Sequence, residues 1–170
     1  GEASYLSEGI PLIRSLNVYD DRFDDDGLAF IGEDQAAGLA NVTVESMDIL
    51  LNITGASVAR CCMAPERYLP ARVNQHVMII RIDAAQANPF FVHAAINSDE
   101  RKRQLLSYAQ KGSTREALTK DMMAAFELVL PSSTLMLQFG EIAATAFLQR
   151  ENLALQNQKL KAVRDLLLPR

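Results

Sequence analysis

The C-terminal segment, residues 132–170, constrains the fold most. After Ser132-Ser133, which is typical of a helix cap, it holds one glycine, Gly140, and no proline before Pro169. Its apolar residues recur at alternating spacings of four and three, which is a heptad pattern. A helix of about 35 residues is about 52 Å long. Because a domain of this size cannot cover such a helix with its own core, we predict that one stripe pairs with another helix.

We call this predicted pairing surface the heptad stripe. Gln149 and Gln156 fall on the same lattice, and polar residues in such positions cost stability but fix the register, which favours a specific partner. A self-complementary stripe is consistent with a dimer. The alternative is a helix that folds back across its own domain. The predicted pairing residues are Phe139, Ile142, Leu153, Leu160, Val163 and Leu167.

The preceding part of the chain, residues 1–131, mixes strand and helix patterns. The sequence has 170 residues and is 49% hydrophobic, enough to bury a single core. We therefore predict an α+β domain over residues 1–131, followed by one long coiled-coil-type helix over 132–170. The predicted strands are 10–13, 42–44, 48–53, 77–82 and 126–130, and the predicted helices cover 90–95 and 98–106, with another that begins at Ser113.

The charge is unevenly distributed along the chain. The formal net charge of −4 at first argues against nucleic acid as a partner. However, residues 1–59 hold 2 basic and 11 acidic groups, whereas residues 60–120 hold 10 basic and 5 acidic groups. The middle of the chain is therefore basic, and we expect weak DNA binding by the chain alone.

Several other classes of protein do not fit the sequence. The acidic run 20–26 lacks the glutamate that a calcium loop needs at its twelfth position, so we interpret it as a solvated loop. Two adjacent cysteines without a second Cys/His cluster do not make a zinc site. No apolar run is long enough to span a membrane, and no secretory signal opens the chain. We expect a cytoplasmic protein without a bound metal or membrane contact.

A catalytic role finds little support. The common nucleophile, phosphate-loop, dinucleotide and zinc-protease motifs are absent from the sequence. Cys61 or Cys62 as a nucleophile with His76 as its base remains an alternative. We expect that the chain is not an enzyme.

One segment has the pattern of an anion site. Ser113 and Glu116 have the spacing of a capping box, and a helix N-terminus offers free backbone N–H groups to a phosphate. The predicted phosphate contacts are Lys111, Ser113, Thr114 and Arg115. The alternative is an ordinary capped surface helix.

Other residue types suit the edges of bases. Arginine can bond guanine with two hydrogen bonds, and asparagine or glutamine can do so with adenine. These residues also commonly satisfy turns, which is the alternative here. The predicted base contacts are Arg14, Asn17, Arg60, Asn74, Gln75 and His76.

Several motifs resemble one family, in an order and spacing that cover nearly the whole chain. Residues 47–60, MDILLNITGASVAR, resemble the G-D-I-L-x-x-x-x-G motif of specificity subunits of type I restriction–modification systems, with Met47 in place of the first glycine. Residues 74–77, NQHV, match the N-Q-x-V of that family. Residues 111–118, KGSTREAL, and residues 152–169 resemble its later motifs. The conventional start of the recognition domain is missing or shortened before Gly9.

The resemblance implies a DNA-recognition module that is not itself catalytic. It would read one half of a bipartite site on double-stranded DNA and pair through its long helix with a second specificity half or a second copy. It would position modification subunits, which use S-adenosylmethionine to methylate adenine, and a restriction subunit. This chain itself would bind no cofactor. The main alternative is a coiled-coil-dimerising module that contacts only proteins.

Overall fold

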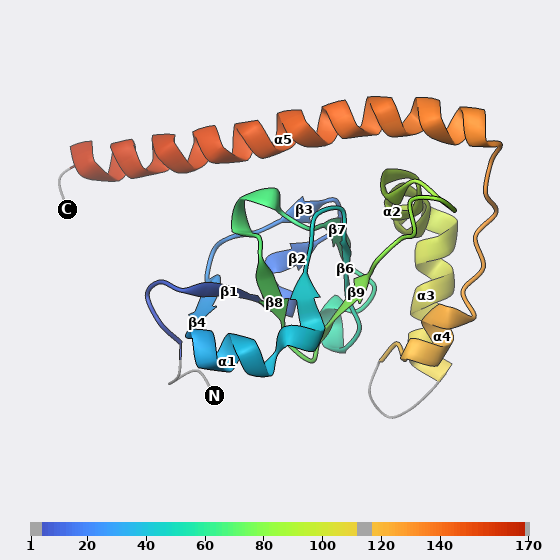
Figure 1. Cartoon of the computed structure of the whole chain (residues 1–170), viewed down its shortest axis with the longest axis horizontal. Helices are drawn as coiled ribbons and strands as arrows, with labels where there is room; N and C mark the ends of the chain where they lie inside the picture. The colour runs from blue at the N-terminus through green and yellow to red at the C-terminus, as the bar shows by residue number, and fades with distance from the viewer. Residues whose placement is uncertain (1–4, 112–116, 169–170) are drawn as a thin grey trace.

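The computed structural model of the chain describes residues 5–111 and 117–168, with an α+β fold and one long C-terminal helix (Figure 1). The strands are β1 (Ile10–Ile13), β2 (Val18–Tyr19), β3 (Arg22–Phe23), β4 (Ala29–Ile31), β5 (Thr43–Val44), β6 (Ile49–Asn52), β7 (Cys61–Met63), β8 (Ala71–Val73) and β9 (Val77–Ile80). The α-helices are α1 (Glu33–Gly38), α2 (Pro89–Asn97), α3 (Asp99–Lys111), α4 (Lys120–Ala124) and α5 (Ser133–Leu167). Single-turn 3-10 helices within the described residues are η2 (Ser15–Asn17), η3 (Ala40–Val42), η4 (Gly55–Ser57) and η5 (Glu66–Tyr68).

The described strands form three small sheets. One has the order β4-β1-β8-β5, one has the order β7-β6-β9, and β2 pairs with β3 as a hairpin. Strands β1 and β8 are parallel, whereas the other pairs are antiparallel. The predicted strands at 10–13, 42–44, 48–53 and 77–82 are thus confirmed, with ends that differ by a few residues.

Strand β6 is buried on both of its faces. Ile49 and Leu51 pack into the core that β6 and β7 share with the helices. Leu50, between them, packs into the core formed with β1, β5 and β8. Because successive side chains of a strand point to opposite faces, this one strand joins the two cores.

The turn before β6 explains the residues of the first motif. Met47 has a φ of 65°, a backbone conformation that glycine adopts without steric cost, which accounts for the motif's usual glycine. The buried Asp48 accepts hydrogen bonds from Arg81 Nε at 2.8 Å and Nη2 at 2.7 Å. This two-bond pair compensates the burial of the carboxylate and fixes the turn against β9.

Helix α5 lies along one side of the domain and crosses α2 (Figure 1). Phe147 on α5 packs against Phe90 on α2, with ring centroids 5.6 Å apart. At Gly140 the two helices come so close that a Cβ atom would lie 2.8 Å from Cγ of Asn88. Asn88 is the N-cap of α2, and its Oδ1 accepts from Phe90 N at 2.9 Å. The single glycine of the long helix therefore makes this crossing possible.

The face of α5 that packs on the domain is not the heptad stripe. The less exposed residues of α5 are Met136, Gly140, Ala143, Ala144, Phe147, Glu151, Ala154 and Gln158. At 100° per residue, the heptad stripe is turned by about 140° from them. It is largely exposed, with Ile142 at 74% and Leu160 at 66%. Its first member, Phe139, differs because it meets Phe91 edge to face at 5.9 Å.

Two expectations about this region change. The long helix folds back along its own domain, which is the alternative named from the sequence, and it does so with a separate face that leaves the heptad stripe available for the predicted pairing. The predicted strand at 126–130 is wrong, because residues 126–130 connect α4 to α5 without strand structure and pair with no strand among the described residues. Its alternating pattern instead places Phe126 and Leu128 against the core that β6 and β7 share with the helices. Val129, on the other side, is 82% exposed. The predicted helix start at Ser113 lies outside the described residues.

We predict that Gly140→Ala lowers the free energy of unfolding by about 1–2 kcal/mol, because the added methyl displaces the Asn88 cap or separates α5 from α2. Urea denaturation followed by circular dichroism measures this. The matched control is Gly38→Ala on α1, where a Cβ atom meets no heavy atom within 4 Å. This control should be neutral or stabilising by up to about 1 kcal/mol. Equal effects of the two substitutions would contradict the close helix crossing.

Candidate functional site

Two hollows meet at His76, on the side of the domain away from α5, where the turn between β8 and β9 lies (Figure 1). The larger one, about 660 Å³, is here called the amide hollow, and its polar lining residues are Tyr5, Arg14, Gln35, Asn41, Asn74, Gln75 and His76. The other, about 480 Å³, is here called the arginine hollow and is lined by Ser15, Leu16, Tyr19, Thr54, Gly55, Ala56, Ser57, Arg60 and His76. Five of the six predicted base contacts line these two hollows.

The His76 side chain is held in place between the hollows. A 2.7 Å hydrogen bond joins its Nδ1 to Thr54 Oγ1, so the ring orientation is set from the end of β6. Its backbone carbonyl accepts from Ile53 N at 3.0 Å. Because Nδ1 is engaged, Nε2 is the ring nitrogen left to contact a ligand.

The two amides of the β8–β9 turn have different roles. Asn74 Oδ1 accepts from the backbone N–H of His76 at 3.1 Å, which stabilises the turn. One of the two lone pairs of its amide oxygen is therefore already used, and the amide is oriented by the turn rather than by a ligand. Gln75 is exposed, and no hydrogen bond to its side chain is found within the described part of the chain. Gln75 is thus the better base contact of the two.

Asn17 is misplaced among the predicted base contacts. It is fully buried, at 0% exposure, and its Nδ2 donates to the Asp24 carbonyl at 2.9 Å. Its Oδ1 accepts from Arg14 N at 3.0 Å. Both ends of the amide are used to hold the loop after β3, so Asn17 has a structural role.

The predicted phosphate contacts fall at the edge of what the structure describes. Helix α3 ends at Lys111, and Ser113, Thr114 and Arg115 lie outside the described residues, as does the Lys111 side chain. The described chain resumes at Ala117, which pairs with Thr54 of the arginine hollow. These four residues stay a prediction.

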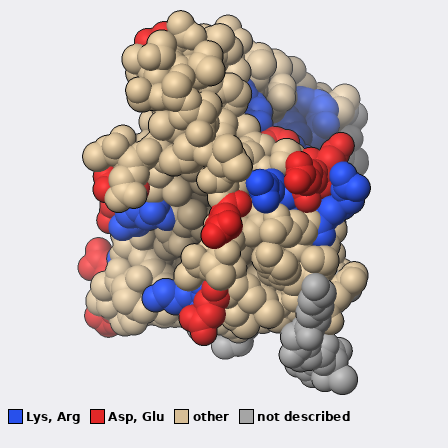
Figure 2. Space-filling model, turned by 90° about the vertical axis from the view of Figure 1, so that its right-hand side faces the viewer, with Lys and Arg blue, Asp and Glu red and all other residues tan. Residues whose placement is uncertain are grey.

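Among the described residues in the basic middle of the chain, three cations are paired with carboxylates. Lys102 Nζ lies 2.6 Å from Asp20, Arg67 Nη1 lies 2.7 Å from Glu151, and Arg81 pairs with Asp48. On the face that carries α3 and α4, Figure 2 shows basic and acidic groups side by side on a mostly uncharged surface. The excess of positive charge along the sequence therefore does not translate into a continuous basic patch on that face.

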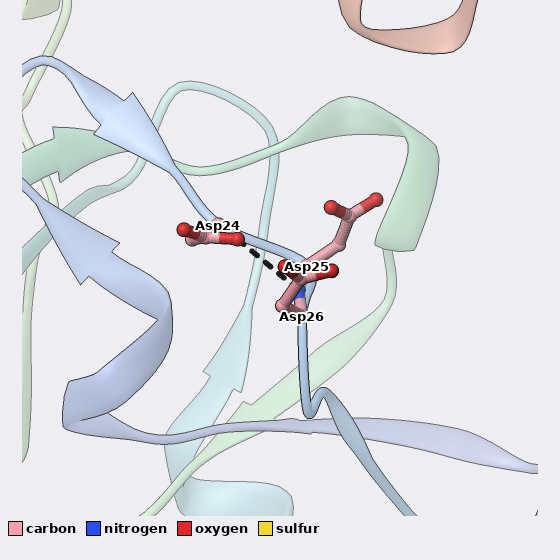
Figure 3. Close-up of side chains that lie close together, drawn as sticks. All are labelled: Asp24, Asp25 and Asp26. Atoms are coloured by element: carbon pink, nitrogen blue, oxygen red, sulfur yellow. Dashed lines mark hydrogen bonds between the residues drawn. The ribbon is translucent and has the colours of Figure 1, made fainter. Parts of the chain in front are cut away.

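The acidic run forms a loop with its own contacts. Asp24, Asp25 and Asp26 each place a carboxylate oxygen within 4.8 Å of the others (Figure 3). Asp24 accepts from the Asp26 backbone N–H at 3.2 Å, and Asp25 accepts from the Tyr68 hydroxyl at 3.1 Å. These bonds account for the arrangement of Asp24 and Asp25 as parts of a loop.

Both cysteines are core side chains. Cys61 and Cys62 are free thiols at 0% exposure, and they lie opposite Leu51 and Leu50 in the β6–β7 pair. Burial raises the pKa of Cys62 to about 12 and the pKa of Cys61 well above its ordinary value. Since the thiolate is the reactive form, this environment disfavours the nucleophile hypothesis.

Sequence patterns missed part of the hollows. Tyr19 and Thr54 each contact a predicted base contact, Arg60 and His76 respectively, yet neither belongs to a polar cluster in the sequence. Gln35 and Asn41 reach the amide hollow from α1 and η3. Gly55 has a φ of 73°, a backbone conformation that favours glycine and is typical of a turn.

Comparison with known proteins shows a shared fold. No family model matches the chain, and neither does any curated protein. A chain in a solved structure described as "Structural basis underlying complex assembly and conformational transition of the type I R-M system" matches 92% of this chain with a TM-score of 0.56. The two sequences are 15% identical, and the match covers 40% of that chain. This chain therefore spans less than half the length of the one it resembles.

None of the helices within residues 5–111 and 117–168 combines the length and the apolar character that crossing a membrane requires.

A polar network around the buried His93 connects the β2–β3 turn to α2. Asn97 Nδ2 donates to the Asp21 carboxylate at 2.9 Å and to the Cys61 carbonyl at 3.0 Å. His93 Nε2 lies 3.1 Å from the same amide nitrogen and 3.5 Å from Asp21. Burial lowers the pKa of His93 from its ordinary value of 6.5, and the Asp21 carboxylate opposes this in part.

This network predicts a pH-dependent stability. Below pH 6.5 the unfolded chain protonates His93 while the folded chain, with its lowered pKa, resists protonation, so the unfolded state binds more protons. The free energy of unfolding should therefore fall as the pH is lowered from 7.5 to 5.5, measured by urea denaturation. His93→Gln should flatten this dependence. An unchanged slope in His93→Gln would contradict a neutral, buried imidazole.

Proposed function

We propose that this chain is a DNA-recognition module of a type I restriction–modification system and reads one half of a bipartite site. The observation that carries the proposal is the fold, which matches a chain of such a system over 92% of this chain. The clustering of five predicted base contacts around two adjoining hollows supports it independently.

In this proposal the amide and arginine hollows face the bases. Gln75 is exposed at the tip of the β8–β9 turn, and its free amide suits an adenine edge. Arg14 donates to the Gly27 carbonyl at 2.7 Å and stacks on Tyr5, which stabilises its position in the amide hollow. Lys111, Ser113, Thr114 and Arg115 would contact phosphates beside them.

The long helix would serve assembly. The heptad stripe is exposed while the opposite side of α5 is fixed to the domain, so a second helix can pair without disturbing the fold. The partner helix would belong to a second specificity half or a second copy. Modification subunits carrying S-adenosylmethionine, and a restriction subunit, would supply the catalysis. Within the described residues, Lys102, Arg67 and Arg81 are paired with carboxylates of the chain, which suits a module that binds DNA tightly only inside such a complex.

We predict that Gln75→Ala relaxes specificity at one base pair. Loss of a two-bond contact should reduce the discrimination against the wrong base by about 5- to 150-fold, with little change in binding to random DNA. Selection from randomised duplexes by the chain assembled with its modification subunits measures both quantities.

The matched control for this experiment is Gln86→Ala. Gln86 is also exposed, but it lies in the loop between β9 and α2 and bonds Asp83. Its loss should leave the selected sequence unchanged. If neither the wild-type chain nor the complex selects any sequence, the proposed function is wrong and the alternative of a protein-interaction module is favoured.

A second prediction concerns the heptad stripe. Leu160→Asp places a charge in the pairing surface and should convert a dimer into a monomer, as measured by light scattering during size-exclusion chromatography. Leu148→Asp is the matched control, because Leu148 is 58% exposed but lies off the stripe. A wild-type chain that is monomeric at high concentration would count against pairing of the helices, though not against DNA recognition.

A further inference from the structure

Arg60 lines the arginine hollow, and its guanidinium is held there by an aromatic contact. Its Cζ lies 4.7 Å from the centroid of the Tyr19 ring. Its backbone is fixed on both sides, since Arg60 N donates to the Ser57 carbonyl and the Arg60 carbonyl accepts from Asn52 N. Within the described residues, the ring of Tyr19 is the one partner of the Arg60 side chain. Its N–H groups are therefore available for a ligand.

Arg60 differs in this respect from the other arginines nearby. Arg22 approaches the same Tyr19 ring at 4.7 Å, but it also pairs with Asp24 at 3.4 Å. Arg67 and Arg81 are committed to carboxylates. Arg60 thus combines a fixed orientation with unused hydrogen-bond donors, which is the condition for a contact that loses little entropy on binding.

The lining of the arginine hollow suits a base edge better than a phosphate. Among the described residues it holds one cation and no carboxylate, and it adds hydroxyls, an imidazole and the half-exposed Leu16. A phosphate is bound by several cations or by a row of backbone N–H groups. A base pair instead offers a few hydrogen-bonding atoms beside apolar surface. Gly55, with no side chain, leaves the rim open, since a Cβ there would meet nothing within 4 Å.

We propose that the arginine hollow is the guanine-reading subsite of this chain. The Arg60 guanidinium donates two hydrogen bonds to O6 and N7 of one guanine, and Tyr19 is a positioning residue that holds the guanidinium plane by stacking. This inference rests on the proposed function, because it assumes that the hollow faces DNA. It adds the base that is read, the residue that reads it and the residue that orients the reader.

The decisive variant is Arg60→Lys. Lysine keeps the charge that a phosphate contact needs, but its single ammonium lacks the rigid, planar pair of donors that a guanidinium aligns with O6 and N7, so its contact with guanine is weaker. In selections and competition binding with the chain assembled with its modification subunits, we expect the preference for guanine at one position to fall by about 5- to 150-fold. Binding to random duplex and its salt dependence should stay close to wild type. Retained guanine preference in Arg60→Lys would overturn the proposal.

The role of Tyr19 is tested by a pair of variants. Tyr19→Leu removes the stacking surface and should reduce the same preference by about 2- to 5-fold. Tyr19→Phe keeps the ring and should restore it. Thermal unfolding of each variant separates a loss of orientation from a loss of folding. Equal preferences in Tyr19→Leu and wild type would remove Tyr19 from the subsite.

Arg22→Gln is the control, because it tests whether the loss of any cation that stacks on the Tyr19 ring is enough to change the guanine preference. It removes a cation beside Tyr19, but Arg22 lies outside the lining of the arginine hollow, so the guanine preference should persist. If Arg22→Gln abolishes the preference as Arg60→Lys does, the assignment to Arg60 is wrong.

If the wild-type assembly selects no sequence at all, the proposed function fails. If it selects a sequence whose preferences Arg60→Lys leaves intact, this inference alone fails.

Discussion

The burial of β6 on both faces is the constraint on which the rest of the molecule depends. Ile49 and Leu51 belong to the core that β6 and β7 share with the helices, and Leu50 belongs to the core formed with β1, β5 and β8. A one-residue shift in register would exchange these faces and place each side chain in the wrong core. The Asp48–Arg81 pair at the start of the strand fixes that register by joining the turn to β9.

The far end of the same strand assembles the candidate site. The buried Asn52 donates from Nδ2 to the Ser15 carbonyl at 2.8 Å and to the Val18 carbonyl at 3.2 Å, which holds the chain at the start of η2 and directly before Tyr19. Ile53 N donates to the His76 carbonyl, and the Ile53 carbonyl accepts from Leu118 N. Three distant segments therefore converge within a few residues of β6, and the hollows form between them.

The acidic and basic segments are separate along the chain but lie side by side in the folded structure. The acidic N-terminal third and the basic middle neutralise one another through pairs such as Asp20–Lys102 and Asp48–Arg81. These pairs position secondary structure and neutralise part of the surface charge. The hollows add a few oriented groups that can contact a ligand, such as Arg60 and His76. Such an arrangement favours discrimination between partners over strong non-specific attraction.

The sequence by itself determined the long helix, its cap at Ser132 and most of the strands, because periodicity and capping depend on residues close together in the chain. It also indicated Arg60, Gln75 and His76 from their residue types. Only the tertiary structure decided that Asn17 is buried, that residues 126–130 form no strand, and that Gly140 marks a helix crossing. It alone placed Tyr19 beside Arg60 and Thr54 beside His76. These outcomes depend on contacts between segments far apart in the chain, which no local pattern contains.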